Sequence, residues 1–210
     1  MEPPFVRAVA YGSYDGGLRD LIHLLKYAGV KPAAKVLGRM LAEAISDIEA
    51  DFLATPIAIV PVPLHRARFR QREFNHAELI ARVALKLMAA PQGFHLCADA
   101  LERRRETQSQ TGLTRHQRRE NVRGAFGVAR PEIVKGHEVL LVDDVYTTGA
   151  TVSECGRVLR RAGASKVWVA TVARTLKAVE HHVEIQFSGD TAGDEDSGAH
   201  EIPLARAAGS

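Results

Sequence analysis

The sequence predicts an α/β fold in which a mostly parallel central sheet is flanked by helices. Two short aliphatic runs, Ile57–Val60 and Val139–Val142, have the length and uniform apolarity of buried parallel strands. The second run is followed by a predicted helix that ends at Gly163 and by a further apolar segment over 166–172. Because a strand–helix–strand unit places its two strands parallel, with the helix against one face, this order favours a parallel sheet.

Two amphipathic helices are expected before the first strand. The earlier one carries apolar residues at helical spacing from Leu18 to Leu25, and Gly29 suits its end. Pro32 suits the first turn of the later helix, whose apolar stripe reaches Ile48. The strand over 57–60 then follows.

A basic segment over 65–72 follows that strand, and we expect it to form a loop. Asn75, with Glu78 three residues later, matches the capping box that begins many helices. The apolar residues behind it predict an amphipathic helix that ends near Pro91.

The stretch over 103–112 is polar throughout, and we predict an exposed, mobile loop there. Thr114 and Gln117 form a second capping-box pattern, which predicts a short and very polar helix.

Charge is distributed unevenly along the 210 residues. The net charge is +3, but residues 65–130 hold 14 Lys and Arg against 6 Asp and Glu, whereas residues 178–210 hold 1 against 7. We therefore expect one domain over 1–177, with 1–55 helical and 56–177 as its core, and an acidic, disordered tail over 178–210. The basic middle is expected to meet an anionic ligand.

Several classes of protein are excluded at this stage. The longest apolar runs are too short to cross a bilayer, and MEPPFVRAVAY has no signal-peptide pattern. The two cysteines, Cys97 and Cys155, cannot form a disulfide framework, and without a CxxC pair we expect no zinc. A reducing cytoplasm and no membrane contact are the expected setting.

The segment after the 139–142 strand has the composition of a sugar-phosphate site. Asp143 and Asp144 stand at the carboxyl end of a predicted parallel strand, where ligands bind in open α/β sheets. Residues 147–151, TTGAT, form a turn of small residues into a helix, whose free amides and dipole favour an anion. Either feature alone is ordinary turn chemistry. Together they predict a cradle for one phosphate, with two acids placed for neighbouring hydroxyls or a divalent cation.

The segment VLLVDDVYTTGAT resembles the phosphoribosyl-pyrophosphate (PRPP) motif of type I phosphoribosyltransferases. Three further stretches, YDGGLRDLIHLLKYAG, PVPLHRARFRQREFNHAELIA and RRRETQSQTGLTRHQRRENVRGAF, together resemble the ComF/GntX family of competence-associated phosphoribosyltransferase-like proteins. The resemblance covers about residues 8–175. It implies a type I phosphoribosyltransferase fold with an N-terminal helical hood, and PRPP bound with Mg²⁺ at the strand ends.

Carried over position by position, the resemblance assigns a role to each part of the site. Asp143 and Asp144 would meet the ribose hydroxyls as catalytic acids, with Mg²⁺ carried by PRPP beside them. The 5-phosphate would be bound by Thr147, Thr148, Gly149, Ala150 and Thr151. Pyrophosphate would be bound by Arg66, Arg68, Arg70 and Arg72. The loop over 103–112 would cover PRPP and bring Arg103, Arg104 and Arg105 to the leaving group, with Arg104 and Arg105 taken as catalytic.

Two departures from the family pattern bear on these assignments. Many members begin with a cysteine-rich zinc-binding segment, which this sequence lacks. The family usually reads Arg-Gly-Phe-Asn where this chain has Arg72-Glu73-Phe74-Asn75. The carboxylate of Glu73 would either repel pyrophosphate or point to solvent, and the sequence leaves both open.

Three functions remain in competition. The main hypothesis is phosphoribosyl transfer from Mg·PRPP to an unidentified acceptor. The second is a PRPP or nucleotide sensor without turnover, because no base pocket is evident. The third is a nucleic-acid-binding accessory of DNA uptake, suggested by the charge over 65–130 and the family's link to competence. A homo-oligomer remains open. His23 is interpreted as an ordinary histidine, and Tyr146 as a ring that either packs or flanks the ribose or a base.

Overall fold

The computed structural model describes residues 3–53, 56–108 and 112–175. Met1–Lys177 form one compact unit. The predicted acidic tail over 178–210 and residues 109–111 of the predicted mobile loop lie outside the described residues.

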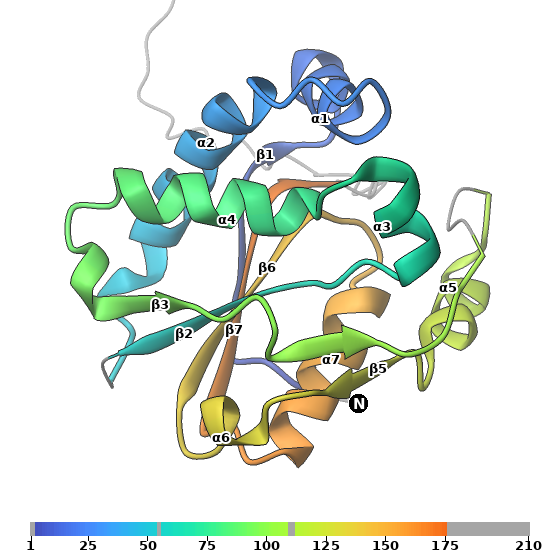
Figure 1. The fold of residues 1–210 in the computed structure, drawn as a ribbon. Coiled ribbons are helices and arrows are strands. Elements are labelled where there is room, and N and C mark those ends of the chain that lie inside the picture. Colours follow the sequence, from blue (N-terminus) through green and yellow to red (C-terminus); the bar gives the residue numbers. More distant parts are fainter. Residues whose placement is uncertain (1–2, 54–55, 109–111, 176–210) are drawn as a thin grey trace, which may run out of the picture. The chain divides into compact units, whose positions relative to one another are not determined.

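The expected parallel sheet is present and has five strands (Figure 1). In spatial order they are β1 (Ala8–Ser13), β7 (Lys166–Arg174), β6 (Glu138–Tyr146), β2 (Ile57–Pro61) and β3 (Phe94–Leu96). Every neighbouring pair is parallel. Because all strands point the same way, their carboxyl ends meet at one edge of the sheet.

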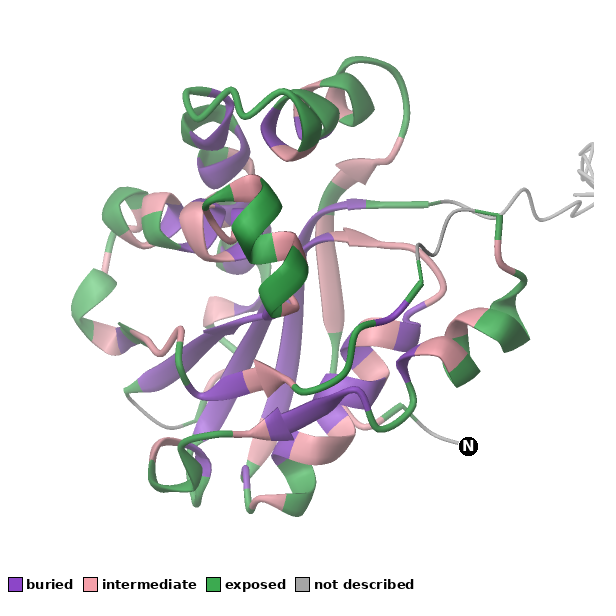
Figure 2. Cartoon of the chain, turned by 45° about the vertical axis from the view of Figure 1, so that its right-hand side comes forward, coloured by how far each residue is buried: buried purple, intermediate pink, exposed green. Residues whose placement is uncertain are grey.

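Helices cover both faces of this sheet. Helices α1 (Gly16–Tyr27), α2 (Ala33–Glu49) and α4 (His76–Leu87) contribute to one buried cluster. Helix α7 (Ala150–Arg161) contributes to the other. Leu140 belongs to the first cluster and Leu141 to the second, as expected for consecutive residues of a strand buried on both faces. The central strands β2, β6 and β7 are accordingly mostly buried between two helical layers, whereas the edge strand β1 is only partly buried (Figure 2).

A smaller antiparallel pair lies beside the main sheet. It consists of β4 (Leu101–Arg103) and β5 (Phe126–Val128), and α5 (Arg115–Val122) connects the two. The predicted capping box of α5 is confirmed: Gln117 N donates to Thr114 Oγ1 at 3.3 Å, and Thr114 N donates to Gln117 Oε1 at 2.8 Å. A 3₁₀ turn, η1 (Pro91–Gly93), and a short helix, α6 (Pro131–Val134), complete the unit.

The segment over 65–72 is a helix, so the prediction of a loop was wrong. Helix α3 (Arg66–Arg72) begins where Ala67 N donates to the His65 side chain. It ends at Glu73, whose φ of 64° is left-handed. The run lacks glycine and proline, and arginine is a good helix former, so with the cap at His65 it forms about two helical turns.

The next helix begins at Asn75 as expected, but the predicted capping box is not formed, because Glu78 bonds to Arg82 and Asn75 caps Ala77 N instead. Asn75 accepts a hydrogen bond from Ala77 N at 3.1 Å and donates to Val62 O at 3.0 Å. Glu78 pairs with Arg82 one turn further on, at 2.7 Å. Asn75 therefore starts α4 and also ties it to the segment that follows β2.

The N-terminal segment over 1–55 does more than supply the two predicted helices. It also supplies β1, an edge strand that pairs with β7. This strand was not predicted, because its sequence shows no strong alternation of apolar and polar residues. Helix α2 packs closely on α4 at Gly38, where only a residue without a side chain fits. A Cβ added to Gly38 would lie 2.5 Å from Val83 Cγ1.

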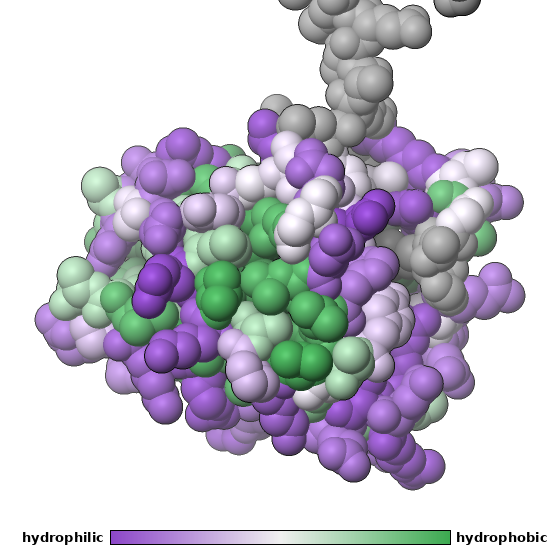
Figure 3. All heavy atoms as spheres, turned by 90° about the horizontal axis from the view of Figure 1, so that it is seen from above, coloured by the Kyte–Doolittle hydropathy of each residue, from purple (hydrophilic) through white to green (hydrophobic). Residues whose placement is uncertain are grey.

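Some apolar side chains of the N-terminal helices stay at the surface. Figure 3 shows apolar side chains gathered on one face of the molecule, among polar ones. Leu24, Val30 and Val36 are among the exposed large apolar residues of this part of the chain. Within the described ranges, no helix has the length and apolarity that a membrane span requires.

Candidate active site

A cavity of about 550 Å³ opens at the carboxyl ends of β6 and β2. Its walls come from α1, from the segment after β2, from α3 and α5, and from the chain between β6 and α7. Segments far apart in the sequence therefore meet at the edge of the sheet where the sequence predicted a site.

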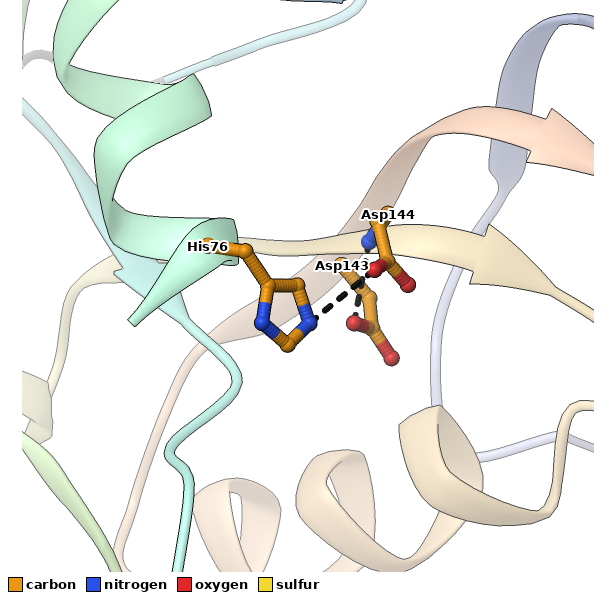
Figure 4. Close-up of side chains that lie close together, drawn as sticks. All are labelled: His76, Asp143 and Asp144. Carbon is orange, nitrogen blue, oxygen red and sulfur yellow. Dashed lines mark hydrogen bonds and ion pairs between the residues drawn. The ribbon is translucent and has the colours of Figure 1, made fainter. Parts of the chain in front are cut away.

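Asp143 and Asp144 lie in the last part of β6 and line this cavity. The strand runs through both acids to Tyr146, further than the four aliphatic residues indicated. Figure 4 shows the two carboxyl groups beside His76 at the start of α4. The backbone N–H of Asp144 donates to Asp143 Oδ1 at 2.9 Å, and this hydrogen bond orients the Asp143 carboxyl group.

Asp144 is held by two cationic or polar partners. Lys26 Nζ of α1 lies 2.5 Å from Asp144 Oδ2, and His76 Nε2 lies 2.9 Å from the same oxygen. The side chain of Asp144 is only 5% exposed. Burial by itself would raise the pKa of this carboxyl group, but Lys26 and His76 outweigh burial and hold its pKa well below the usual range. Asp144 is therefore a fixed negative charge.

Asp143 behaves in the opposite way. Burial, and next the negative charge of Asp144, raise the pKa of Asp143 from 3.8 to about 7. Lys26 and Arg103 oppose this rise without cancelling it. The cavity thus contains one ionised carboxylate, Asp144, already paired with protein groups, and a second, Asp143, whose ionised form would be stabilised by an incoming cation.

The predicted turn from the strand into a helix is present between β6 and α7. Gly149 has φ 75° and precedes the first residue of α7, and no side chain caps this helix end. The start of α7 lies at the cavity, since Gly149, Ala150 and Thr151 line it, and a helix N-terminus favours an anion. Of the predicted phosphate-binding residues, those that line the cavity are Thr147, Gly149, Ala150 and Thr151.

Thr148 and Tyr146 differ in whether they line the cavity. Thr148 is not among the lining residues, and its Oγ1 is buried with no hydrogen-bond partner among the described residues. Tyr146 lines the cavity and covers Gly149, because a Cβ added to Gly149 would lie 2.4 Å from the Tyr146 hydroxyl oxygen. Glycine is required here both by φ and by this close approach.

Five arginines line the cavity: Arg19 comes from α1, and the other four come from three further elements. Arg68 and Arg72 come from α3, Arg103 from the end of β4 and Arg118 from α5. Burial, and next the charge of Arg68, lower the pKa of Arg103. Its Nε has no hydrogen-bond partner among the described residues, and its guanidinium lies 5.1 Å from the Phe126 ring centroid. This concentration of positive charge suits an oligophosphate.

The other predicted arginines lie outside the cavity lining. Arg66 and Arg70 are exposed on α3. Arg104 pairs with Glu102 at 2.7 Å, and Arg105 donates to Asn121 O at 3.0 Å and to Arg123 O at 2.9 Å. Glu73, left open in the sequence, is exposed at the end of α3 and is not a lining residue.

Sequence reasoning missed several residues of the site. Lys26, His76 and Arg118 all line the cavity, and none was predicted to belong to it. Arg19, His23 and Lys26 recur at helical spacing opposite the buried residues of α1, which was the available signal. His76 directly follows the Asn75 cap, and no pattern in the sequence connected it with Asp144.

The donor groups bear on whether a divalent cation fits here. In the part of the chain that the structure describes, His76, Asp143 and Asp144 are the one group with three potential ligand atoms within 4.8 Å of one another. Lys26 and His76 already contact Asp144, so Asp143 is the carboxylate best placed to meet a cation. One available carboxylate suits a magnesium ion that arrives with phosphate oxygens and water as its other ligands.

Comparisons with known proteins agree with this geometry. A family model described as "Phosphoribosyl transferase domain" matches residues 78–201, a range that includes the acid pair and the turn into α7. The chain is 34% identical over 175 residues to the DNA utilization protein YhgH of Escherichia coli (strain K12), covering 83% of this chain and 74% of the relative. It is 32% identical over 175 residues to Competence protein F of Haemophilus influenzae, covering 82% and 75%. It is 27% identical over 167 residues to Competence protein ComFC of Streptococcus pneumoniae, covering 77% and 66%. The chain belongs to the phosphoribosyltransferase domain family, and within it to the ComF family of phosphoribosyltransferase-like proteins.

Proposed function

We propose that this protein binds Mg·PRPP in the cavity and transfers its phosphoribosyl group to an acceptor, with release of pyrophosphate. One observation carries the proposal: a single cavity joins an anion cradle over 147–151, an acid pair at 143–144 and a cluster of arginines. These are the three kinds of group that a sugar with a 5-phosphate, neighbouring hydroxyls and a diphosphate requires.

Each part of the ligand has a matching part of the protein. The 5-phosphate would accept hydrogen bonds from the amides at the start of α7. The ribose hydroxyls would donate to Asp143 and Asp144 at the end of β6. The diphosphate would meet Arg68, Arg72, Arg103 and Arg118.

The reaction would rely on positioning and on electrostatic stabilisation. The acceptor forms a bond to C1 of the ribose while the bond from C1 to the pyrophosphate oxygen breaks, and the bonding electrons leave with pyrophosphate. Asp144, kept ionised by Lys26 and His76, would hold the ribose and stabilise positive charge on it. The arginines would stabilise the charge that builds on the leaving group. Mg²⁺, held on the protein side by Asp143, would supply further neutralisation of the diphosphate.

Calorimetry with Mg·PRPP tests the binding step. Arg68→Gln and Arg70→Gln form a matched pair, because both lie on α3 but only Arg68 lines the cavity. Loss of a charge-assisted contact costs about 1.5–3 kcal/mol, so Arg68→Gln should weaken binding by roughly 10- to 150-fold, whereas Arg70→Gln should bind like the wild type. Equal affinities of both variants and the wild type would show that the diphosphate lies elsewhere. An absence of Mg·PRPP binding to the wild type would remove the proposal.

Turnover separates an enzyme from a sensor. Release of pyrophosphate from PRPP in the presence of an acceptor supports the transferase. Tight Mg·PRPP binding with no release, over a panel of nucleobases and amines, would leave the sensor as the function.

A second candidate function is binding of single-stranded nucleic acid. Two observations favour it: the relatives are named for DNA utilization and competence, and α3 carries the exposed Arg66 and Arg70 together with an exposed Phe69. Filter binding of a labelled oligonucleotide at low and high salt tests this role. The double variant Arg66→Gln/Arg70→Gln should weaken binding and reduce its salt dependence while leaving Mg·PRPP affinity unchanged. Unchanged oligonucleotide binding in this variant would exclude α3 from the interface.

A further inference from the structure

One wall of the cavity holds none of the groups that we assign to direct contact with PRPP. It is formed by one face of α1 together with the chain just before it, and its lining residues are Tyr14, Arg19, His23, Lys26 and Tyr27. We call these five residues the α1 wall. Arg19, His23 and Lys26 are spaced four and three residues apart, so they lie on one side of the helix. Ile22 and Leu25, on the other side, are buried in the core.

The aromatic members of the α1 wall contact one another but remain open to the cavity. The Tyr14 hydroxyl lies 2.8 Å from His23 Nε2, in a hydrogen bond that orients the imidazole. The His23 and Tyr27 rings meet edge to face, with centroids 5.3 Å apart. The Arg72 guanidinium lies 5.1 Å from the Tyr27 centroid. Tyr27 is nevertheless 69% exposed, and His23 is exposed as well, so their faces can still receive a ligand.

The wall is also positively charged, by a residue other than Lys26. Lys26 is neutralised by Asp144. Arg19 has only a weak contact with its neighbour Asp20, at 3.4 Å between two exposed side chains. Its charge is therefore available to a ligand on this side of the cavity.

A ligand of defined chemistry follows from these properties. Rings that lie open at a cavity wall favour a flat aromatic surface, and a histidine with one nitrogen engaged offers the other as a hydrogen-bonding group. A nearby arginine favours a carboxylate. We infer that the α1 wall binds the acceptor, and that the acceptor is a planar heterocycle with an anionic substituent. This inference rests on the proposed function, because it assigns the second substrate of the same cavity.

Nucleotides that share the ribose 5-phosphate and differ only in the charge of the base test the inference. Orotidine and uridine 5′-monophosphates differ by one carboxylate, and nicotinate and nicotinamide mononucleotides differ by a carboxylate in place of a carboxamide. Titration calorimetry gives the affinity ratio within each pair. In at least one pair the carboxylated member should bind at least about tenfold more tightly, which corresponds to about 1.4 kcal/mol.

Variants then assign that preference to named residues. Arg19→Gln should bring the ratio close to one, while the matched control Arg66→Gln, an exposed arginine outside the cavity, should keep it. Tyr27→Ala should weaken both members of a pair by the same factor, and Tyr27→Phe should restore them. A ratio near one in the wild type for both pairs, or a ratio that survives Arg19→Gln, overturns the inference.

Binding of PRPP distinguishes this outcome from failure of the proposed function. If Mg·PRPP binds and the ratios are near one, only the inference about the acceptor falls. If neither Mg·PRPP nor ribose 5-phosphate binds, the proposed function falls and the inference falls with it.

Discussion

The buried ion pair between Lys26 and Asp144 makes a quantitative prediction about stability. Lys26→Met keeps most of the aliphatic length of the side chain but removes the ammonium group 2.5 Å from Asp144 Oδ2. The side chains are 17% and 5% exposed, so water from the cavity replaces the lost partner only in part. Removal of one partner of a buried pair typically costs 3–5 kcal/mol, and we expect a loss in the lower part of that range, about 3 kcal/mol, because His76 still contacts Asp144.

Urea unfolding followed by circular dichroism measures this loss. Lys35→Met on α2 is the control, since it makes the same substitution at an exposed position. We expect it to change the free energy of unfolding by less than about 0.5 kcal/mol. The double variant Lys26→Met/Asp144→Asn should lose clearly less than the sum of the single losses, because the two groups interact directly. A loss below about 1 kcal/mol for Lys26→Met, or strictly additive losses, would refute the assignment of a strong buried pair.

Three further predictions concern other parts of the unit. Because burial and Asp144 raise the pKa of Asp143 to about 7, the folded chain keeps a proton that the unfolded chain releases near pH 3.8, so stability should fall as pH rises. The wild type should lose about 2–3 kcal/mol between pH 5 and pH 8 relative to Asp143→Asn, and parallel unfolding profiles would contradict this. Gly38→Ala should cost about 1–3 kcal/mol in urea unfolding, because its Cβ would meet both Cγ1 and Cβ of Val83; Val83→Ala in the same chain should recover only part of this loss, since the Cβ of residue 83 stays, and a loss below about 0.5 kcal/mol for Gly38→Ala would contradict such close packing. Gly149→Ala should abolish detectable Mg·PRPP binding in calorimetry, since φ and the Tyr146 hydroxyl both oppose a Cβ, and binding at the wild-type affinity would exclude this turn as the phosphate site.

The sequence was most informative where local rules decide the structure. The aliphatic runs of β2 and β6, the Thr114 capping box and the glycine at the start of α7 follow from residues close together in the chain. The helix over 66–72 was missed for a local reason too, because a run of arginines indicated solvent exposure, and exposure was taken for a loop.

The partners of the acid pair could not be predicted in this way. Lys26 and His76 reach Asp144 from two different helices, and nothing in their own surroundings in the sequence indicates that approach. The opposite pKa shifts of Asp143 and Asp144 depend on the same contacts. The two aspartates are adjacent and chemically identical in the sequence, but the fold raises the pKa of one and lowers that of the other. The strand β1 was missed because it is short and its partner, β7, is far along the chain.

The pairing of β1 with β7 sets the order in which a newly made chain can complete its fold. Thr171 Oγ1 donates to Val9 O across 162 positions of sequence. The edge of the sheet next to α1 therefore cannot close until the ribosome has released almost the whole unit. Lys26 follows β1 and Asp144 precedes β7, so this late pairing also fixes the two elements that carry the Lys26–Asp144 contact.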